Sequence, residues 1–387
     1  MADLQDDEDI PLSTGGASAH AEEGAEGEAE ELRPGPHTST HTSARTSAHT
    51  PAPEERARAL LTEHPVADGH SGLAWALSRL TWYDLELGDT ALQADLPRLR
   101  EGAVGAMFWS LRLPQAYEAN RAVSATLALI DLAETVVRAY PEGLRLAHTA
   151  SHTADARAHG RIACLLGPAA AAAIDDCLGT LRALQRLGVR SLTLSGTRWA
   201  GERGLSRFGE EVVREMNRLG VLADLSGSST ATVKHTLTVS RAPVIFSRSA
   251  AHALTPHPDN VPDDLLAALR DHNGLCLVPC TAAQTGPALR DVADHLDHVR
   301  RVAGPECVGI SGMYDTGSAL PDGLHDTSRY PQLIAELLDR GWPDADVSLL
   351  TWGNVQRVLR EADFTAKAAQ IRRAPSTATL DRLDGEN

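Results

Sequence analysis

The sequence has few cysteines, few aromatic residues and no excess of basic charge. Five cysteines in 387 residues do not form a disulfide framework, and their place in or beside apolar runs predicts buried free thiols. The formal net charge of −16 argues against nucleic acid as a partner, because phosphate binding needs a basic face. The cysteines are Cys164, Cys177, Cys276, Cys280 and Cys307.

The chain also lacks long apolar runs and several common catalytic motifs. No stretch of about 18 apolar residues is present, and the first ten residues are acidic, so neither a transmembrane helix nor a signal peptide is predicted. We therefore expect a cytoplasmic protein with no membrane partner. There is no phosphate-binding P-loop, no GxGxxG after a strand and no GxSxG nucleophile elbow.

Composition divides the chain into a tail and a folded part. Residues 1–53 are acidic and then rich in Ser, Thr and His, with almost no apolar side chains, which predicts a disordered tail. The tail histidines His37, His41 and His49 are the weaker alternative of a metal-binding tract. Residues 54–364 have the length of one large barrel domain, and residues 365–387 are predicted to form a short helix and a frayed end.

The stretch from 204 to 252 indicates a parallel α/β architecture. Val212, Val213 and Met216 recur at helical spacing, and the short apolar run VLADLS follows between two glycines. A second helix over 230–239 and the strand PVIFS repeat the pattern. In parallel barrels the chemistry lies where such strands end.

Nine segments are predicted to be strands, separated mostly by helical patterns. Near-continuous apolar runs are typical of strands buried on both faces of a parallel barrel. A (β/α)8 TIM barrel has eight strand positions, so one candidate is peripheral, and the sequence does not identify it. The candidates are the segment before His70 and the runs VGAMFWSL, LRLAHTA, RIACLLG, SLTLS, VLADLS, PVIFS, LCLVPC and CVGIS.

Several long segments resemble the membrane (renal) dipeptidase family. They include DGH, GLSRFGEEVVREMNRLGVLADLS, SRAPVIFS and PDNVPDDLL, then VGISGMYD and GLHDTSRYPQLIAELLDRGW, in order over most of the chain. The resemblance implies a metallo-dependent-hydrolase TIM barrel that binds two zinc ions and cleaves dipeptides. It also implies dimers, as a homodimer or as a heterodimer with an active paralogue.

The same resemblance implies that nearly all metal positions are substituted. The family's first ligand pair is His-x-Asp, and here His70 is followed by Gly72. Ala169 takes the place of the bridging glutamate, and Gly227 and Arg248 take the places of two zinc histidines. One histidine cannot hold a binuclear zinc site, and an arginine has no acceptor atom for a metal. We therefore expect no resident cofactor.

Positions that act on substrate in the family are substituted as well. The substrate-side histidine corresponds to Gly196, the carboxylate-binding arginine to Asp259 and the catalytic aspartate to Met313, with Asp315 beside it. We expect these residues to line the former pocket. If the side chains point inward, Arg248 pairs with Asp259 or Asp315, and otherwise Arg248 is solvated.

Three hypotheses about function remain. The favoured one is a catalytically inactive dipeptidase homologue, a pseudoenzyme that binds a partner or a small peptide-like ligand. The second is a metallodipeptidase with an altered metal site that includes His70. The third is a small-molecule-binding or biosynthetic protein that reuses the barrel mouth.

Overall fold

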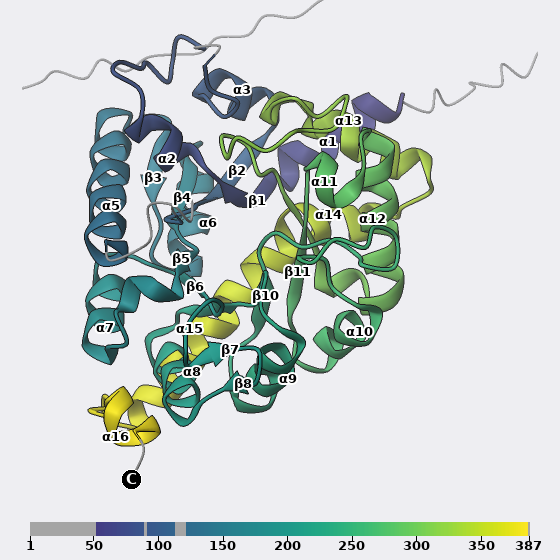
Figure 1. Ribbon diagram of the computed structural model, residues 1–387. Coiled ribbons are helices and arrows are strands. Elements are labelled where there is room, and N and C mark those ends of the chain that lie inside the picture. Colours follow the sequence, from purple (N-terminus) through teal and green to yellow (C-terminus); the bar gives the residue numbers. More distant parts are fainter. Residues whose placement is uncertain (1–51, 89–90, 113–120, 386–387) are drawn as a thin grey trace, which may run out of the picture. The chain divides into compact units, whose positions relative to one another are not determined.

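The computed structural model describes residues 52–88, 91–112 and 121–385, and Figure 1 shows their arrangement. The predicted tail lies almost wholly outside these residues. Nine main strands are present, at the nine predicted places. They are β1 (Val66–Ser71), β2 (Val104–Trp109), β3 (Leu144–Leu146), β4 (Ile162–Leu166), β6 (Ser191–Thr193), β9 (Leu222–Asp224), β10 (Val244–Phe246), β11 (Leu275–Pro279) and β12 (Val308–Ser311).

The strands form a parallel TIM barrel. One sheet has the order β1-β2-β4-β3 and the other the order β12-β11-β10-β9-β6-β5, where β5 is the short Ala169–Ala170. A parallel bridge between Leu166 and Val189 joins the two sheets at one seam. At the other seam, Met313 N–H donates to His70 O at 2.9 Å. Because β2 pairs with β4, the strand β3 at the edge of the first sheet is the peripheral one of the nine.

Helices surround the strands and cover their outer faces. Within the described residues the longer ones are α1 (Pro53–Glu63), α5 (Ala122–Ala139), α6 (Ala150–Ala158), α7 (Leu178–Arg186), α8 (Arg207–Leu219), α9 (Thr230–Val239), α10 (Asp263–Asp271), α12 (Leu289–Ala303), α13 (Tyr330–Asp339) and α15 (Asn354–Arg372). Short helices are α2 (Leu73–Ser78), α3 (Leu96–Glu101), α11 (Ala282–Thr285), α14 (Asp344–Ser348) and α16 (Leu380–Asp384), and β7 (Ala200–Gly201) pairs with β8 (Gly204–Leu205).

Helix α8 shows how the sequence sets these boundaries. Ser206 caps its first turn by accepting a hydrogen bond from Gly209 N–H at 3.1 Å, and Gly220 ends it at φ 70°. Its apolar face, with Val212 and Met216, is fully buried. The predicted helix and the strand β9 after it are therefore confirmed.

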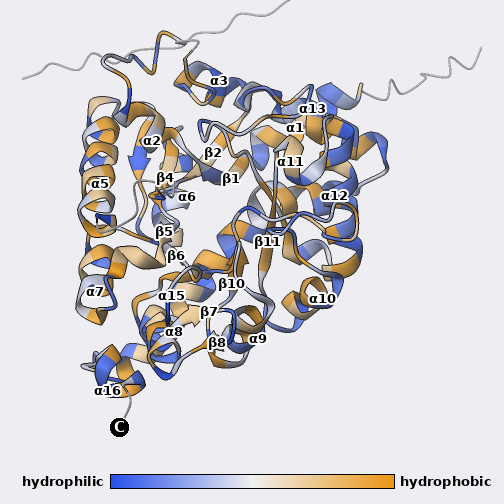
Figure 2. Ribbon diagram, viewed as in Figure 1, coloured by the Kyte–Doolittle hydropathy of each residue, from blue (hydrophilic) through white to orange (hydrophobic). Residues whose placement is uncertain are grey.

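Neighbouring residues of most main strands pack in two different clusters. Met107 and Trp109 of β2 join the surrounding helices, whereas Ala106 and Phe108 join a second cluster with residues of α15. The hydropathy colours of Figure 2 show the alternation of apolar and polar residues along the outer helices. The second cluster is the barrel interior, because the helices enclose the barrel from outside.

Helix α15 closes the end of the barrel where the strands begin. Asn354 Nδ2 donates to Val308 O at 2.9 Å, and Arg357 Nη2 donates to Gly274 O at 3.3 Å, both at starts of strands. The opposite end, where the strands finish, is the mouth. Helix α15 continues past the predicted domain end at 364, with Ala362 and Ala366 both buried.

Candidate functional site

His70 lies at the end of β1 and is buried, with 4% of its surface exposed. Its backbone N–H donates to Asp68 Oδ1 at 3.0 Å. Its ring atom Nδ1 is buried and has no hydrogen-bond partner among the described residues. Burial holds the pKa of His70 well below its usual value, and the charges of Arg248 and Arg112 lower it further. The imidazole is therefore neutral.

A loop from β12 lies directly on Gly72. Gly72 N–H donates to Tyr314 O at 2.8 Å, and a Cβ atom at this position would lie 2.4 Å from Asp315 O. Met313 and Asp315 in this loop have positive φ values of 55° and 61°. An aspartate side chain at position 72 does not fit unless this loop moves. Gly72 therefore lacks a ligand side chain and also makes a close backbone contact with the loop.

Asp315 is held by Gln93. Its Oδ1 accepts from Gln93 N–H at 2.8 Å, and its own N–H donates to Gln93 Oε1 at 2.8 Å. Oδ2 is buried without a partner among the described residues, and burial raises the pKa of Asp315 to about 6. The predicted pairing of Arg248 with Asp315 is wrong, since this carboxylate instead accepts a hydrogen bond from the backbone N–H of Gln93.

Asp68, just before His70, anchors the seam between β1 and β12. Its Oδ1 accepts from Gly312 N–H at 2.7 Å, and its Oδ2 accepts from the Tyr330 hydroxyl at 2.7 Å. Burial raises the pKa of Asp68 to about 6, against the opposing effect of these hydrogen bonds. Sequence reasoning missed this residue, although a charged side chain inside an apolar strand was the available signal.

Ala169 and Gly196 contribute no functional group. Ala169 is fully buried in β5, opposite Leu192 of β6. Gly196 has a φ of 73° and no atom within 4 Å of a Cβ placed there, so the space beside it is open. Both positions agree with the sequence in offering neither a ligand atom nor a proton carrier.

Asp224 at the end of β9 is the second charged residue that sequence reasoning missed. It is fully buried, and Thr193 Oγ1 donates to its Oδ2 at 2.5 Å. Its Oδ1 accepts from Ser226 Oγ at 2.9 Å and from Ser247 N–H at 2.9 Å. The carboxylate thus joins the ends of three neighbouring strands.

Arg248 points into the mouth beside Asp224. Its Nη1 lies 3.8 Å from Asp224 Oδ2, and 13% of the side chain is exposed. The alternative of an outward, solvated Arg248 is therefore wrong, and the expected partner Asp259 is wrong as well, since no such ion pair is present. Asp259 lies near Gly227, where a Cβ would be 3.2 Å from Asp259 Oδ1 and 3.8 Å from Arg248 Nη2.

The mouth residues do not fit a zinc site. Within residues 52–88, 91–112 and 121–385 there is no group of three or more His, Cys, Asp or Glu side chains that could hold a metal ion. A structural or catalytic zinc needs three or four such ligands. Asp68 and Asp224 have their carboxylates engaged by protein donors, and the guanidinium of Arg248 repels a cation.

Four of the five cysteines are buried, as predicted, and Cys177 is not. Cys164, Cys276 and Cys280 are buried, with the pKa of Cys164 raised to about 12 by burial, and Cys307 is buried too. Cys177 is exposed at the start of α7, because it precedes the apolar face of that helix instead of belonging to it. No cysteine in the described part of the chain joins the mouth as a metal ligand.

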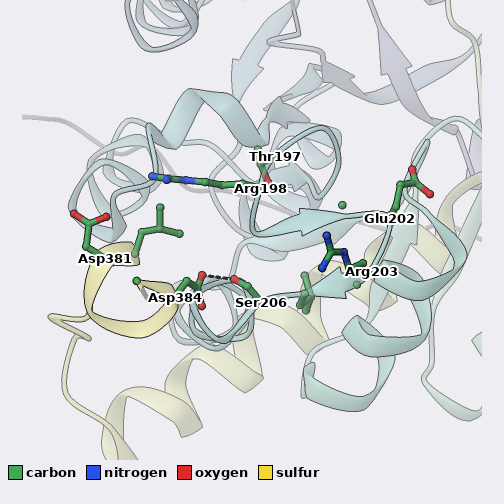
Figure 3. A pocket seen from close by; sticks show the side chains of 12 residues that line it. Thr197, Arg198, Glu202, Arg203, Ser206, Asp381 and Asp384 are labelled. Atoms are coloured by element: carbon green, nitrogen blue, oxygen red, sulfur yellow. Dashed lines mark hydrogen bonds between the residues drawn. The ribbon is translucent and has the colours of Figure 1, made fainter. Parts of the chain in front are cut away.

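The described part of the chain has several cavities, and two of them differ in their relation to the predicted site. One of about 820 Å³ lies between the β7–β8 hairpin and α16, where the Ser206 hydroxyl donates to the Asp384 carboxylate (Figure 3). Arg198 and Arg203 also line it. The other, of about 230 Å³, is lined by Gly227 and Asp259 among others. Only this second cavity contains residues predicted from the sequence.

Comparison with known proteins agrees with this barrel and its segment order. Residues 54–373 match the family model described as membrane dipeptidase, peptidase family M19. The chain belongs to this family. Dipeptidase 3 of Mus musculus is 40% identical over 338 residues, which cover 81% of this chain and 67% of that protein. Dipeptidase verJ of Clonostachys rogersoniana is 36% identical over 337 residues, which cover 79% of this chain and 86% of that protein.

Solved structures of M19-type proteins share the fold. A metallo peptidase from Rhodobacter sphaeroides, liganded with a phosphinate mimic of the dipeptide L-Ala-D-Ala, aligns with a TM-score of 0.72 at 24% identity, covering 77% of this chain and 99% of that one. The dipeptidase AC, a metallo peptidase of family M19, aligns with a TM-score of 0.71 at 25% identity, covering 77% and 98%. No helix in the described part of the chain is long and apolar enough to cross a membrane.

Proposed function

We propose that this member of the dipeptidase family is catalytically inactive and acts by binding a partner protein or a small peptide-like ligand. The observation that carries the proposal is the isolation of His70. Its Nδ1 is buried without a partner, and the described residues around it provide no second and third metal ligand. Catalysis by zinc requires a metal ion that is held by about three protein ligands and keeps one coordination position for water or substrate.

The contact at Gly72 gives independent support. A ligand side chain at this position would collide with the backbone of Asp315, so the barrel mouth has no room for a side chain there. The guanidinium of Arg248 lies beside the buried carboxylate of Asp224. Its positive charge is a second obstacle to metal binding. A zinc ion placed at this end of β10 would meet a fixed positive charge.

An active metallodipeptidase is the second candidate. Relatives at 36–40% identity are named dipeptidases, and the imidazole of His70 is held in the neutral form that binds metals. In this case His70 would act with ligands that the described residues do not supply. Reuse of the mouth for another small molecule also requires no zinc, so metal analysis separates it only from the metallodipeptidase, and ligand screening by thermal shift separates it from the binding proposal.

The decisive experiment combines metal analysis with a dipeptidase assay. Untagged full-length protein, purified without chelators, is expected to contain far less than one zinc per chain and to hydrolyse no dipeptide when zinc is supplied. His70→Ala serves as the matched variant, and it is expected to leave both results unchanged. Stoichiometric zinc and hydrolysis that disappear in His70→Ala would establish the metallodipeptidase instead.

Binding to a protein partner is tested separately. The family resemblance favours a homodimer or a heterodimer with an active paralogue. Sedimentation of the purified chain, alone and mixed with a co-expressed paralogue, measures both. A chain that stays monomeric in both experiments and retains no dipeptide-like ligand contradicts the binding proposal.

A further inference from the structure

The guanidinium of Arg248 has no hydrogen-bond acceptor in the described part of the chain. Its side chain is 13% exposed, and Nη1 is buried without a hydrogen-bond partner. The nearest carboxylate oxygen, Asp224 Oδ2, is 3.8 Å away, which is too far for a hydrogen bond. A largely buried arginine whose donors are not satisfied costs stability, unless another group supplies the acceptors.

Asp224 cannot supply them without losing its own contacts. Oδ1 accepts hydrogen bonds from the N–H of Ser226 and from that of Ser247, at 3.2 and 2.9 Å, as well as from the Ser226 hydroxyl. Oδ2 accepts from the Thr193 hydroxyl at 2.5 Å. Turning this carboxylate toward Arg248 would break hydrogen bonds that connect β6, β9 and β10. Asp224 therefore offsets the charge of Arg248 but leaves its donors open.

A second unsatisfied polar atom lies in the same mouth. His70 Nδ1 is buried and unpartnered among the described residues. His70 lies at the end of β1 and Arg248 lies just after the end of β10, so both belong to the same end of the barrel. An imidazole ring can donate a hydrogen bond, so a hydrogen-bond acceptor that entered here would meet donors from β1 and from the end of β10.

We propose that Arg248, assisted by His70, binds the carboxylate of a small ligand at the barrel mouth. The planar fork of a guanidinium matches the two oxygens of a carboxylate, which satisfies the open donors in pairs. The site rests on the proposed function, because it requires that no zinc occupies His70.

The surrounding charges favour a singly charged ligand over a phosphate. Asp224 lies 3.8 Å from the guanidinium, and Asp259 lies near Gly227 on the side toward Arg248 Nη2. A dianion would meet both of these carboxylates, whereas a ligand carboxylate carries half the charge of a dianion and is repelled less. A peptide-like acid, with one carboxylate on an uncharged body, has the matching chemistry.

The test measures the thermal shift and binding isotherm of the full-length protein with N-acetylalanine. N-acetylalanine amide controls for the body without the carboxylate, and inorganic phosphate for an anion of another class, all at one ionic strength. N-acetylalanine is expected to raise Tm in a saturable way and the amide to leave it unchanged. Arg248→Met is expected to weaken binding about tenfold or more, and Arg248→Lys by less, since it keeps the charge but loses the fork.

Arg241→Met is the control variant, because Arg241 is exposed and lies outside the mouth. It is expected to bind N-acetylalanine like the wild type. Equal binding by Arg248→Met and wild type, or a shift with phosphate alone, overturns the carboxylate site. Zinc analysis of the same samples keeps the outcomes apart: a zinc-free protein that binds no acid refutes this site only, whereas a zinc-loaded, active protein refutes the proposed function.

Discussion

Arg248 Nη1 and Asp224 Oδ2 lie 3.8 Å apart at the ends of the adjacent strands β10 and β9. The pair is largely buried, and its carboxylate is fixed by hydrogen bonds from three neighbours. Opposite charges at such a distance attract strongly inside a protein, but they also lose hydration. Removing one member of the pair is therefore expected to cost more stability than the intact pair contributes.

This relationship predicts a measurable coupling. Arg248→Met leaves Asp224 buried without a countercharge, and we expect it to lower the free energy of unfolding by about 2 to 4 kcal/mol. Combined with Asp224→Asn, the loss is expected to be smaller than the sum of the two single losses by about 1 kcal/mol. Denaturant unfolding of the four proteins measures the cycle. Asp259→Asn in place of Asp224→Asn is the control, and additivity there with coupling at Asp224 is the expected pattern.

The contact at Gly72 predicts that the family's ligand cannot simply be restored. Gly72→Asp places a Cβ where Asp315 O lies 2.4 Å away, so the loop from β12 must move. We expect a loss of stability of about 2 kcal/mol or more, comparable to other overpacked positions. Gly72→Ala is expected to show most of the same loss, which would identify the Cβ as the cause. An aspartate variant as stable as the wild type contradicts this reading of the loop.

Restoring a single histidine is also expected to fail. Arg248→His removes the positive charge and adds a ligand atom, but Gly72, Ala169 and Gly227 still offer none. Two histidines do not make a closed zinc site. We expect elemental analysis to find no stoichiometric zinc in this variant. Zinc binding by Arg248→His, lost again in Arg248→His with His70→Ala, would reveal ligands not recognised in the described structure.

Much of the fold was predictable because its signals are local. Apolar runs located all nine strands, and the helical spacing of Val212, Val213 and Met216 located α8. The peripheral place of β3 was not predictable, since it depends on which strands pair. The domain end at 364 stays a prediction, and α15 spans this position with Ala362 and Ala366 both buried.

The candidate site was predictable in its substitutions but not in its contacts. The residue types at Gly72 and Arg248 are readable from sequence, yet the pairing of Arg248 with Asp224 depends on side-chain directions at two strand ends. The two hydrogen bonds between Gln93 and Asp315 connect loops that are far apart in the chain. Such contacts come from the closed barrel, which brings all strand ends together.

The acidic tail is expected to contribute little to stability. Its composition provides few apolar side chains that could offset the entropy lost on ordering. The first helix begins at Pro53, so deletion of residues 1–51 removes no described element of the barrel. We expect Tm to change little. A large drop in the truncated protein, measured beside the full-length chain, would mean that the tail docks on the barrel.

His295 predicts a pH dependence of stability. It is 1% exposed, its Nδ1 accepts a hydrogen bond from Ala251 N–H at 3.1 Å, and its Nε2 lies 3.2 Å from Thr255 Oγ1. Protonation would place a second hydrogen between Nδ1 and the backbone N–H. Burial and, to a smaller extent, the charge of His298 lower the pKa of His295 to about 4, although Asp294 and Asp291 act in the opposite direction.

Because the folded pKa is below the unfolded value of about 6.5, the unfolded chain binds more protons between these two values. Stability from this group is therefore complete above about pH 6.5 and is lost as the pH falls toward 4, by about 3 kcal/mol at most. Asp68 and Asp315, whose pKa values are raised to about 6, act with the opposite sign, so a matched variant is needed.

His295→Asn keeps an acceptor for Ala251 but does not titrate. Denaturant unfolding at pH 7 and pH 4.5 is expected to show a larger loss in the wild type than in this variant, while His272→Asn, at an exposed histidine, follows the wild type. Equal losses in wild type and His295→Asn would mean that another group carries the acid sensitivity.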